Sequence, residues 1–312
     1  MNVLTINGIT KHYSSVTALK NVSFSVPEGA IYGILGPNGS GKTTLLGIVT
    51  DVLRASAGYY KFFDGSKPIN EIRKDMGVLL ETPNFYPHLS ALQNLTVVAK
   101  IKGCNLSEIP EVLKKVNLFE RRNSSFKTYS LGMKQRLAIA STLLGNPKIV
   151  ILDEPTNGLD PEGISEIRQL ILQLAKEEKT IILASHLLDE VEKVCSHVAI
   201  LKKGELLTAG DINSALSKEG QGATTVTDAS SPKETSMMEV VAENLQNLAD
   251  VLKILNGVVD VTESGGVITI THYADELTPQ QVNKHCFDNG IVLGRLIAKN
   301  KNLESKFLEL TK

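Results

Sequence analysis

The chain has 312 residues, of which 42% are hydrophobic and 21% charged, and its formal net charge is −1. This composition is typical of a globular protein of about two domains and excludes a disordered chain. The near-zero charge gives no electrostatic reason to expect nucleic acid as a partner. No apolar run approaches the roughly 20 residues that cross a bilayer, and the first residues lack a signal-peptide pattern, so we expect a cytoplasmic protein.

The N-terminal part predicts strands followed by a loop rich in glycine. Apolar and polar residues alternate over 3–6 and 22–26, as in half-buried strands. Residues 30–35 are almost all apolar and predict a buried strand. It ends in the glycine-rich loop 36–41, and a helical pattern begins at Lys42.

Two later apolar runs predict further buried strands. Residues 149–152 and 180–184 are short and rich in β-branched side chains. Such runs are typical of a parallel sheet that helices cover on both faces. A helix-rich region lies before them, at roughly 82–146.

A change in composition predicts a second unit. Residues 221–236 are rich in Gly, Ser, Thr and Ala and are typical of a linker. The elements predicted after it are strand 238–242, helix 244–255, strand 258–262, strand 267–272, helix 278–288 and strand 291–298, which is the order of a ferredoxin-like sandwich. A last amphipathic helix is expected at 303–310. Core packing is the favoured explanation for the helically spaced leucines, and a dimer face is the alternative; these are Leu245, Leu248, Leu252 and Leu255.

The glycine-rich loop carries the first chemical motif. Its sequence, from Gly36 to Thr43, fits G-x-x-x-x-G-K-[ST] between a predicted strand and a predicted helix. Glycines let backbone N–H groups converge on phosphate, and the helix N-terminus adds its positive end. Lys42 is expected to reach the β- and γ-phosphates, and the Thr43 hydroxyl to bind Mg²⁺. Alone, the loop predicts a nucleoside triphosphate and leaves kinases and GTPases open.

Two carboxylates follow the predicted strand 149–152. At the C-terminal edge of a parallel sheet, both Asp153 and Glu154 can approach a bound ligand. Asp153 is expected to hold Mg²⁺ directly or through water, as a hard oxygen ligand. Glu154 is then free to orient and deprotonate the attacking water.

In this order the motifs resemble those of the ATP-binding subunits of ABC transporters, over about residues 1–211. The run from Ser130 to Arg136 resembles the LSGGQ signature, with the serine and the second glycine, Gly132, kept. Leu131 and Met133 replace the first glycine and the glutamine. The run from Glu154 to Asp160 resembles Walker B leading into the D-loop.

The resemblance also implies roles for single residues. His186, after an apolar strand, is similar to the switch histidine of the family, and Tyr13 stands where an aromatic residue stacks on adenine. The implied catalytic residues are Lys42, Glu154 and His186. The implied ATP-binding residues are Tyr13, Gly36, Asn38, Gly39, Ser40, Gly41, Lys42, Thr43, Thr44, Ser130, Gly132 and Asp160. The implied Mg²⁺ residues are Thr43, Asp153 and Glu81.

The family mechanism needs two subunits. In the family, ATP lies between the glycine loop of one copy and the signature of the other. The resemblance therefore implies a second ATPase subunit, and we expect the two subunits to form a homodimer. The Ser130 hydroxyl and the backbone N–H at Gly132, near a helix start, are suited to phosphate. His186 is expected to contact the γ-phosphate, so that hydrolysis releases the closed dimer.

Glu81 departs from the family pattern, which has a glutamine at this place. An ionised carboxylate accepts hydrogen bonds but does not donate them. Glu81 would add negative charge near Mg²⁺, and we expect it still to couple the ATP site to the membrane subunit.

Residues 81–90 and the variant signature resemble the ABC-2 exporters, especially their bacitracin and lantibiotic self-protection branch. That resemblance implies a permease on a separate chain and a location on the inner face of the cell membrane, with the cargo left open. The main alternative is a soluble ABC ATPase that acts on the ribosome or on nucleic acid. Such proteins usually carry two tandem ATPase units, or a long coiled coil between half-sites, whereas this chain has one glycine loop and no sustained heptads. A regulator that barely hydrolyses ATP is a third possibility, which Glu154 disfavours.

The predicted fold class is therefore α/β, a P-loop NTPase of ABC type with a helical subdomain, plus a small C-terminal α+β domain of ferredoxin-like type. The predicted ATPase domain covers 1–220, with the helical subdomain at about 82–146. The linker covers 221–236 and the C-terminal accessory domain 237–312.

Overall fold

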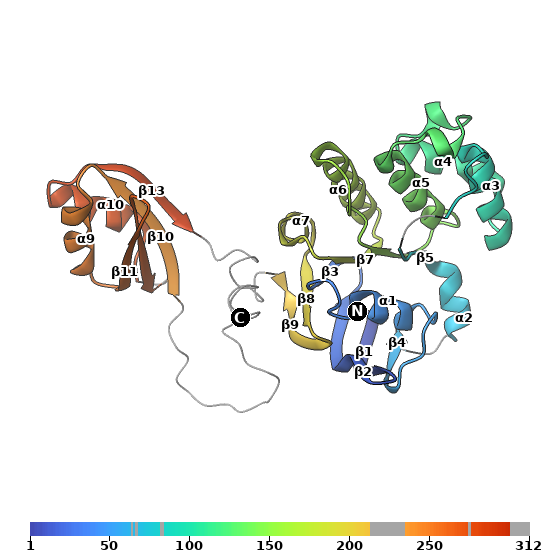
Figure 1. Cartoon of the computed structure of the whole chain (residues 1–312), viewed down its shortest axis with the longest axis horizontal. Helices are drawn as coiled ribbons and strands as arrows, with labels where there is room; N and C mark the ends of the chain where they lie inside the picture. Colours follow the sequence, from blue (N-terminus) through green and yellow to red (C-terminus); the bar gives the residue numbers. More distant parts are fainter. Residues whose placement is uncertain (64, 66–67, 82–83, 213–234, 274–275, 300–312) are drawn as a thin grey trace. The chain divides into compact units, whose positions relative to one another are not determined.

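Figure 1 shows the computed structural model of the chain. The structure describes residues 1–63, 65, 68–81, 84–212, 235–273 and 276–299. They belong to two compact units, the first within 1–212 and the second within 235–299. None of the helices in these ranges is long and apolar enough to cross a membrane.

The first unit begins with a three-stranded antiparallel sheet. Its strands, in the order β2-β1-β4, are β1 (Asn2–Tyr13), β2 (Val16–Pro27) and β4 (Ala57–Phe62). Leu4 on β1 lies opposite Val26 and Phe62, and all three side chains are buried. The strands predicted at 3–6 and 22–26 are confirmed, and both extend further than their alternating patterns.

A six-stranded sheet forms the centre of the first unit, in the order β5-β6-β7-β3-β8-β9. Its strands are β3 (Ile31–Leu35), β5 (Met76–Leu79), β6 (Ile149–Asp153), β7 (Thr180–Ser185), β8 (His197–Lys202) and β9 (Glu205–Asp211). All neighbouring pairs are parallel except β8 and β9. Every residue of β3, β6 and β7 is buried, as their apolar sequences predict. In register, Leu35 pairs with Ser185 and Asp153 with Ala184, so the loops after these three strands leave the same edge of the sheet.

The helices of the first unit are α1 (Lys42–Val49), α2 (Ile69–Ile72), α3 (Ala91–Lys102), α4 (Ile109–Lys115), α5 (Leu131–Leu143), α6 (Pro161–Lys176) and α7 (Leu188–Val194). Of these, α1 begins at Lys42 as predicted and α3, α4 and α5 lie within the predicted helix-rich region, whereas α2, α6 and α7 were not predicted. α3, α4 and α5 pack together as the predicted helical subdomain, and Figure 1 shows them grouped at one end of the unit. Four short 3-10 turns lie at Arg73–Asp75, Leu106–Glu108, Phe119–Arg121 and Phe126–Thr128.

The second unit has the element order β-α-β-β-α-β. Its elements are β10 (Thr235–Ala242), α9 (Leu245–Lys253), β11 (Val258–Ser264), β12 (Val267–Tyr273), α10 (Pro279–Asp288) and β13 (Leu293–Lys299). The antiparallel strands lie in the order β11-β12-β10-β13, which is the arrangement of a ferredoxin-like sandwich.

The row of leucines on α9 packs into the core of the second unit. Leu248 and Leu252 are fully buried, in one cluster with Ile268 and Ile270 of β12. Core packing is therefore confirmed as the reason for their spacing. The predicted helix 303–310 and most of the predicted linker, 221–234, lie outside the described residues. The domain boundaries stay predictions.

Candidate active site

The glycine-rich loop joins β3 to α1 in a tight turn. A Cβ on Gly36 would lie 2.3 Å from the carbonyl oxygen of Leu201 on β8, so the loop approaches its neighbouring strand too closely for any other residue. Gly41 precedes α1 with a φ of 105°, a conformation that L side chains rarely adopt. The hydroxyl oxygen of Ser40 is buried without a hydrogen-bond partner among the described residues. The glycines of the motif therefore meet two backbone requirements, the close approach to β8 at Gly36 and the positive φ at Gly41.

Gly36→Ala is expected to destabilise the protein by about 1–3 kcal/mol, the usual range for forcing extra volume into a packed region. The obstacle is a backbone oxygen of β8, which a rotamer change does not relieve. Chemical denaturation of the purified variant measures the change. Gly294→Ala is the control, because a Cβ there meets only an ordinary contact at 3.7 Å. Equal stability of the Gly36 and Gly294 variants would contradict this description of the loop.

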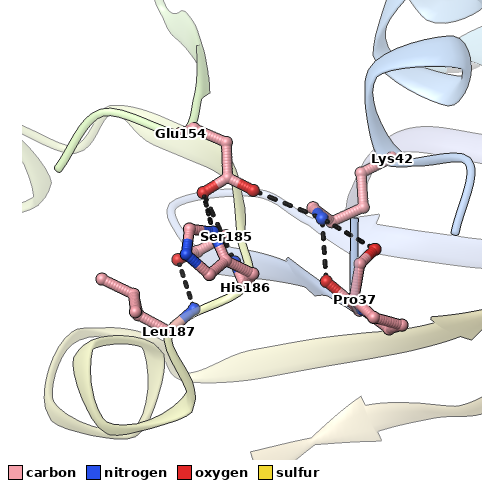
Figure 2. Close-up of polar contacts among 7 residues, drawn as sticks. Pro37, Lys42, Glu154, Ser185, His186 and Leu187 are labelled. Carbon is pink, nitrogen blue, oxygen red and sulfur yellow. Dashed lines mark hydrogen bonds and ion pairs between the residues drawn. The ribbon is translucent and has the colours of Figure 1, made fainter. Parts of the chain in front are cut away.

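The ammonium group of Lys42 lies over this loop. Its Nζ donates to the carbonyl oxygens of Gly36, at 2.8 Å, and Pro37, at 3.3 Å. It also lies 3.3 Å from Oε1 of Glu154, and its side chain is only 5% exposed (Figure 2). The lysine of the motif therefore brings a buried positive charge to the place where the loop meets the carboxylates of β6.

Glu154 follows β6 in a left-handed conformation, with a φ of 47°. Strain of this kind costs on the order of 1–3 kcal/mol and is concentrated at functional sites. The backbone N–H of Glu154 donates to the carbonyl oxygen of Ala184 on β7, at 3.0 Å. This turn places the carboxylate between Lys42 on one side and His186 on the other, as Figure 2 shows.

His186 contacts the second oxygen of the Glu154 carboxylate. The distance from Nδ1 of His186 to Oε2 of Glu154 is 2.8 Å, and the backbone N–H of His186 points to the same oxygen at 3.4 Å. With Glu154 ionised, Nδ1 carries the proton and donates it. The hydroxyl oxygen of Ser185 accepts from the N–H of Leu187 at 3.0 Å and shapes the turn that carries the histidine. This role of Ser185 was not predicted, although a serine at the end of a strand is a common turn signal.

Asp153 is the buried acid of the site, with 4% of its surface exposed. Burial raises the pKa of its carboxyl; the hydrogen bond with the Thr43 side chain and the charge of Lys42 lower it, whereas Glu154 and Glu81 raise it. Its Oδ1 is buried without a hydrogen-bond partner among the described residues. A cation beside Asp153 would favour the ionised form and supply the missing partner.

These features fit Mg²⁺. The ion takes oxygen ligands and is usually held by one or two carboxylates together with substrate phosphates and water. Thr43 and Asp153, predicted as its ligands, lie close enough for the Thr43 side chain to lower the pKa of the Asp153 carboxyl. Glu81 is exposed, has a φ of 60°, and is near enough to affect the pKa of Asp153. The described residues contain no cluster of three or more His, Cys, Asp or Glu side chains that would hold a metal by themselves.

Other predicted residues lie apart from this cluster. Ser130 is exposed at the start of α5, where its hydroxyl oxygen accepts from Met133 N–H at 3.3 Å. Asp160 is exposed and caps α6 by accepting from the N–H of Gly163 at 3.0 Å. In the described part of the chain, no hydrogen bond or ion pair joins either residue to Lys42. Ser130 and Asp160 are therefore exposed residues of the surface that take no part in the Lys42–Glu154–His186 cluster.

The remaining predicted residues are on accessible surfaces. Tyr13, at the end of β1, is 43% exposed, with the ammonium of Lys11 4.9 Å from its ring centroid. Asn38 and Gly39 form the exposed tip of the loop, and Gly132 has open space around it on α5. Thr44 is half-buried in the first turn of α1.

Comparison with known proteins identifies the class. The sequence matches the ABC transporter family over residues 19–157. It is 33% identical to the bacitracin transport ATP-binding protein BcrA of Enterococcus faecalis, over 99% of this chain and 96% of that protein. It is 40% identical to the lantibiotic transport ATP-binding protein SrtF of Streptococcus pyogenes, over 66% of this chain and 89% of that protein.

Solved structures agree with the sequence comparison. CbiO1 of Clostridium perfringens, part of an ABC transporter complex, has a TM-score of 0.61 and 32% identity over 67% of this chain and 88% of that one. A dimeric ATP-binding cassette bound to ADP and Pi has a TM-score of 0.60 and 28% identity over 67% of this chain and 98% of that one.

The fold and the site define a P-loop ATPase of the ABC type. The chain belongs to the ABC transporter family, as an ATP-binding subunit. It binds and hydrolyses ATP to power transport, and it works with a second ATP-binding subunit and with a membrane permease on a separate chain.

Proposed function

We propose that this subunit hydrolyses Mg²⁺-bound ATP with Glu154 as the general base. The observation that carries the proposal is the contact chain from Lys42 through Glu154 to His186, with distances of 3.3 and 2.8 Å. A carboxylate fixed between a lysine and a histidine, beside a phosphate-binding loop, is placed to orient and deprotonate water. General-base catalysis contributes about 10²–10⁴-fold to a rate.

The other residues of the site are suited to bind the phosphates and Mg²⁺. The backbone N–H groups of the loop and the Lys42 ammonium neutralise phosphate charge, which is the larger part of catalysis in phosphoryl transfer. Thr43 and Asp153 would hold Mg²⁺, with Glu81 nearby; the ion, when bound, offsets negative charge on the phosphate oxygens. His186 holds the Glu154 carboxylate through Nδ1. Its Nε2 donates to a γ-phosphate oxygen only in the imidazolium form, in which both ring nitrogens carry a proton.

A second copy of the chain would complete the site. Ser130, Gly132 and Asp160 are predicted to bind nucleotide, and among the described residues no hydrogen bond or ion pair joins any of them to Lys42 of the same chain. Because Ser130 and Asp160 are exposed at helix starts, they are free to meet ATP held by a partner. Tyr13 is exposed where it would stack on adenine.

We also propose that the chain serves an ABC-2 exporter and lies on the inner face of the cell membrane. The names of its relatives, which refer to bacitracin transport and lantibiotic transport, support an exporter that protects against peptide antibiotics. The N-terminal unit offers a surface on which the permease would dock. This surface is a groove of about 400 Å³, and its first lining residue lies three positions after Glu81 in the sequence. The lining residues are Asn84, Phe85, Tyr86, Asn94, Val97, Val98 and Ile101. Tyr86 and Ile101 are 62% and 82% exposed, which is unusual for a cluster of apolar side chains.

Ile101→Asp tests this docking surface. A charge in the groove is expected to reduce the amount of the subunit that co-sediments with permease-containing membranes at least tenfold, because burying an unpaired carboxylate is costly. The ATPase activity of the isolated subunit should stay within about twofold of wild type. Val52→Asp is the matched control, since Val52 is 68% exposed in the same unit but outside the groove. Membrane binding of the Ile101 variant at the wild-type level would refute the docking surface.

A further inference from the structure

An ion pair joins the two helices that follow the catalytic loops. Nε of Arg168, on α6, donates to Oε2 of Glu190, on α7, at 3.0 Å. The Nη2 atom of Arg168 lies 2.8 Å from each carboxylate oxygen. The pair is partly buried, with side chains 27% and 16% exposed. Two-pronged contacts of this kind fix orientation as well as distance.

The pair lies directly behind the catalytic residues. Arg168 and Glu190 line the same small pocket as Pro155 and Ser185, the sequence neighbours of Glu154 and His186. α7 begins two residues after His186, and α6 begins at the residue after Asp160. The ion pair therefore connects the segment that carries the histidine to the segment that leads from the general base into α6.

α7 depends on such a connection. It has seven residues and no side-chain cap at its start, so it is too short to be stable by itself. One face packs on β3, where a Cβ on Gly33 would lie 2.6 Å from Val191 and 3.0 Å from Cys195. This packing sets the distance from α7 to the sheet, and the Glu190 contact holds α7 against α6.

We propose that Arg168 and Glu190 are positioning residues for ATP hydrolysis. By locking α7 to α6 they hold His186 at its 2.8 Å distance from the Glu154 carboxylate. They also fix the position of the segment that carries His186 relative to Asp160 at the start of α6. The inference rests on the proposed roles of Glu154 and His186. It predicts a loss of turnover rather than of ATP binding, because in the described structure no hydrogen bond or ion pair joins Arg168 or Glu190 to the glycine loop.

The test is the steady-state kinetics of Arg168→Gln, Glu190→Gln and the double variant. Each single variant is expected to lower kcat about tenfold with KM for ATP within about twofold, since small misplacements of catalytic groups cost up to about 10²-fold. Arg168→Lys should also be impaired, because an ammonium does not reproduce the two-pronged contact. The double variant should be no slower than either single variant, as is expected for residues that act through each other. A hundredfold loss in the double variant would overturn the proposal.

Glu177→Gln is the matched control. It breaks a second ion pair, in which Nζ of Lys115 lies 2.8 and 2.7 Å from the two carboxylate oxygens of Glu177. Glu177 is the C-cap of α6, at the end of the helix away from Asp160. Its kcat should be unchanged, at a temperature where circular dichroism shows all variants folded. Equal losses in the Glu177 and Glu190 variants, or a wild-type kcat for Glu190→Gln, would refute a positioning role. If Glu154→Gln itself kept full turnover, the proposed function would fail instead.

Discussion

Replacing Glu154 with glutamine is expected to lower kcat for ATP hydrolysis by about 10²–10⁴-fold. Glutamine keeps the size of the side chain and an oxygen that accepts from Nδ1 of His186, but an amide is not a base at neutral pH. ATP affinity should be kept or improved, because the substitution removes a negative charge 3.3 Å from the Lys42 ammonium. Phosphate release measures the first quantity, and equilibrium titration with nucleotide the second.

The control for this substitution is Glu205→Gln. Glu205 also pairs with a lysine, Lys20, at 2.9 Å, but on the exposed surface of the same unit. Surface pairs contribute little, so this variant should hydrolyse ATP at the wild-type rate. A Glu154→Gln variant that retained a tenth or more of the wild-type kcat would show that another group activates the water.

Replacing Lys42 with alanine is expected to weaken ATP binding about 10- to 100-fold. Hydrogen bonds to charged groups contribute about 1.5–3 kcal/mol, and each 1.4 kcal/mol corresponds to a factor of ten in Kd. The substitution also leaves Glu154 without its cation, so the carboxylate would repel the phosphates more strongly. Isothermal titration with ATP and Mg²⁺ measures the loss directly.

Lys20→Ala provides the comparison for Lys42. Both are lysines paired with a glutamate, yet the Lys20 side chain is 46% exposed and that of Lys42 only 5%. The Lys20 variant should bind ATP within twofold of wild type. ATP affinity of the Lys42→Ala variant in the same range would show that the buried ammonium does not contact the phosphates.

Much of the fold follows from local sequence patterns. β3, β6 and β7 are fully buried, and their uninterrupted apolar runs predict this. β4 was not predicted, because most of its residues are exposed and it is defined by pairing with β1 along an edge. Such edge strands depend on a partner distant in sequence, and a window of local residues contains no signal for it.

The candidate site was predictable in its residue types but not in its geometry. The motif around Lys42 and the acids after β6 are contiguous in sequence and easily recognised. The left-handed turn at Glu154, and its contact with His186 32 residues further along the chain, arise from the pairing of β6 with β7. The ion pair of Arg168 with Glu190 likewise needs two helices to pack, so neither residue stands out in the sequence.

This ATPase works in complex with a membrane permease, and isolation of the complex tests this most directly. The experiment is to purify the Glu154→Gln variant, with ATP, from detergent-solubilised membranes of cells that also produce its natural partners, and to identify the proteins that accompany it. We expect a polytopic membrane protein in stoichiometric amount, with two copies of the ATPase per complex. Recovery of ribosomal proteins or nucleic acid without any membrane protein, or of the ATPase alone, would show that the subunit does not work with a permease.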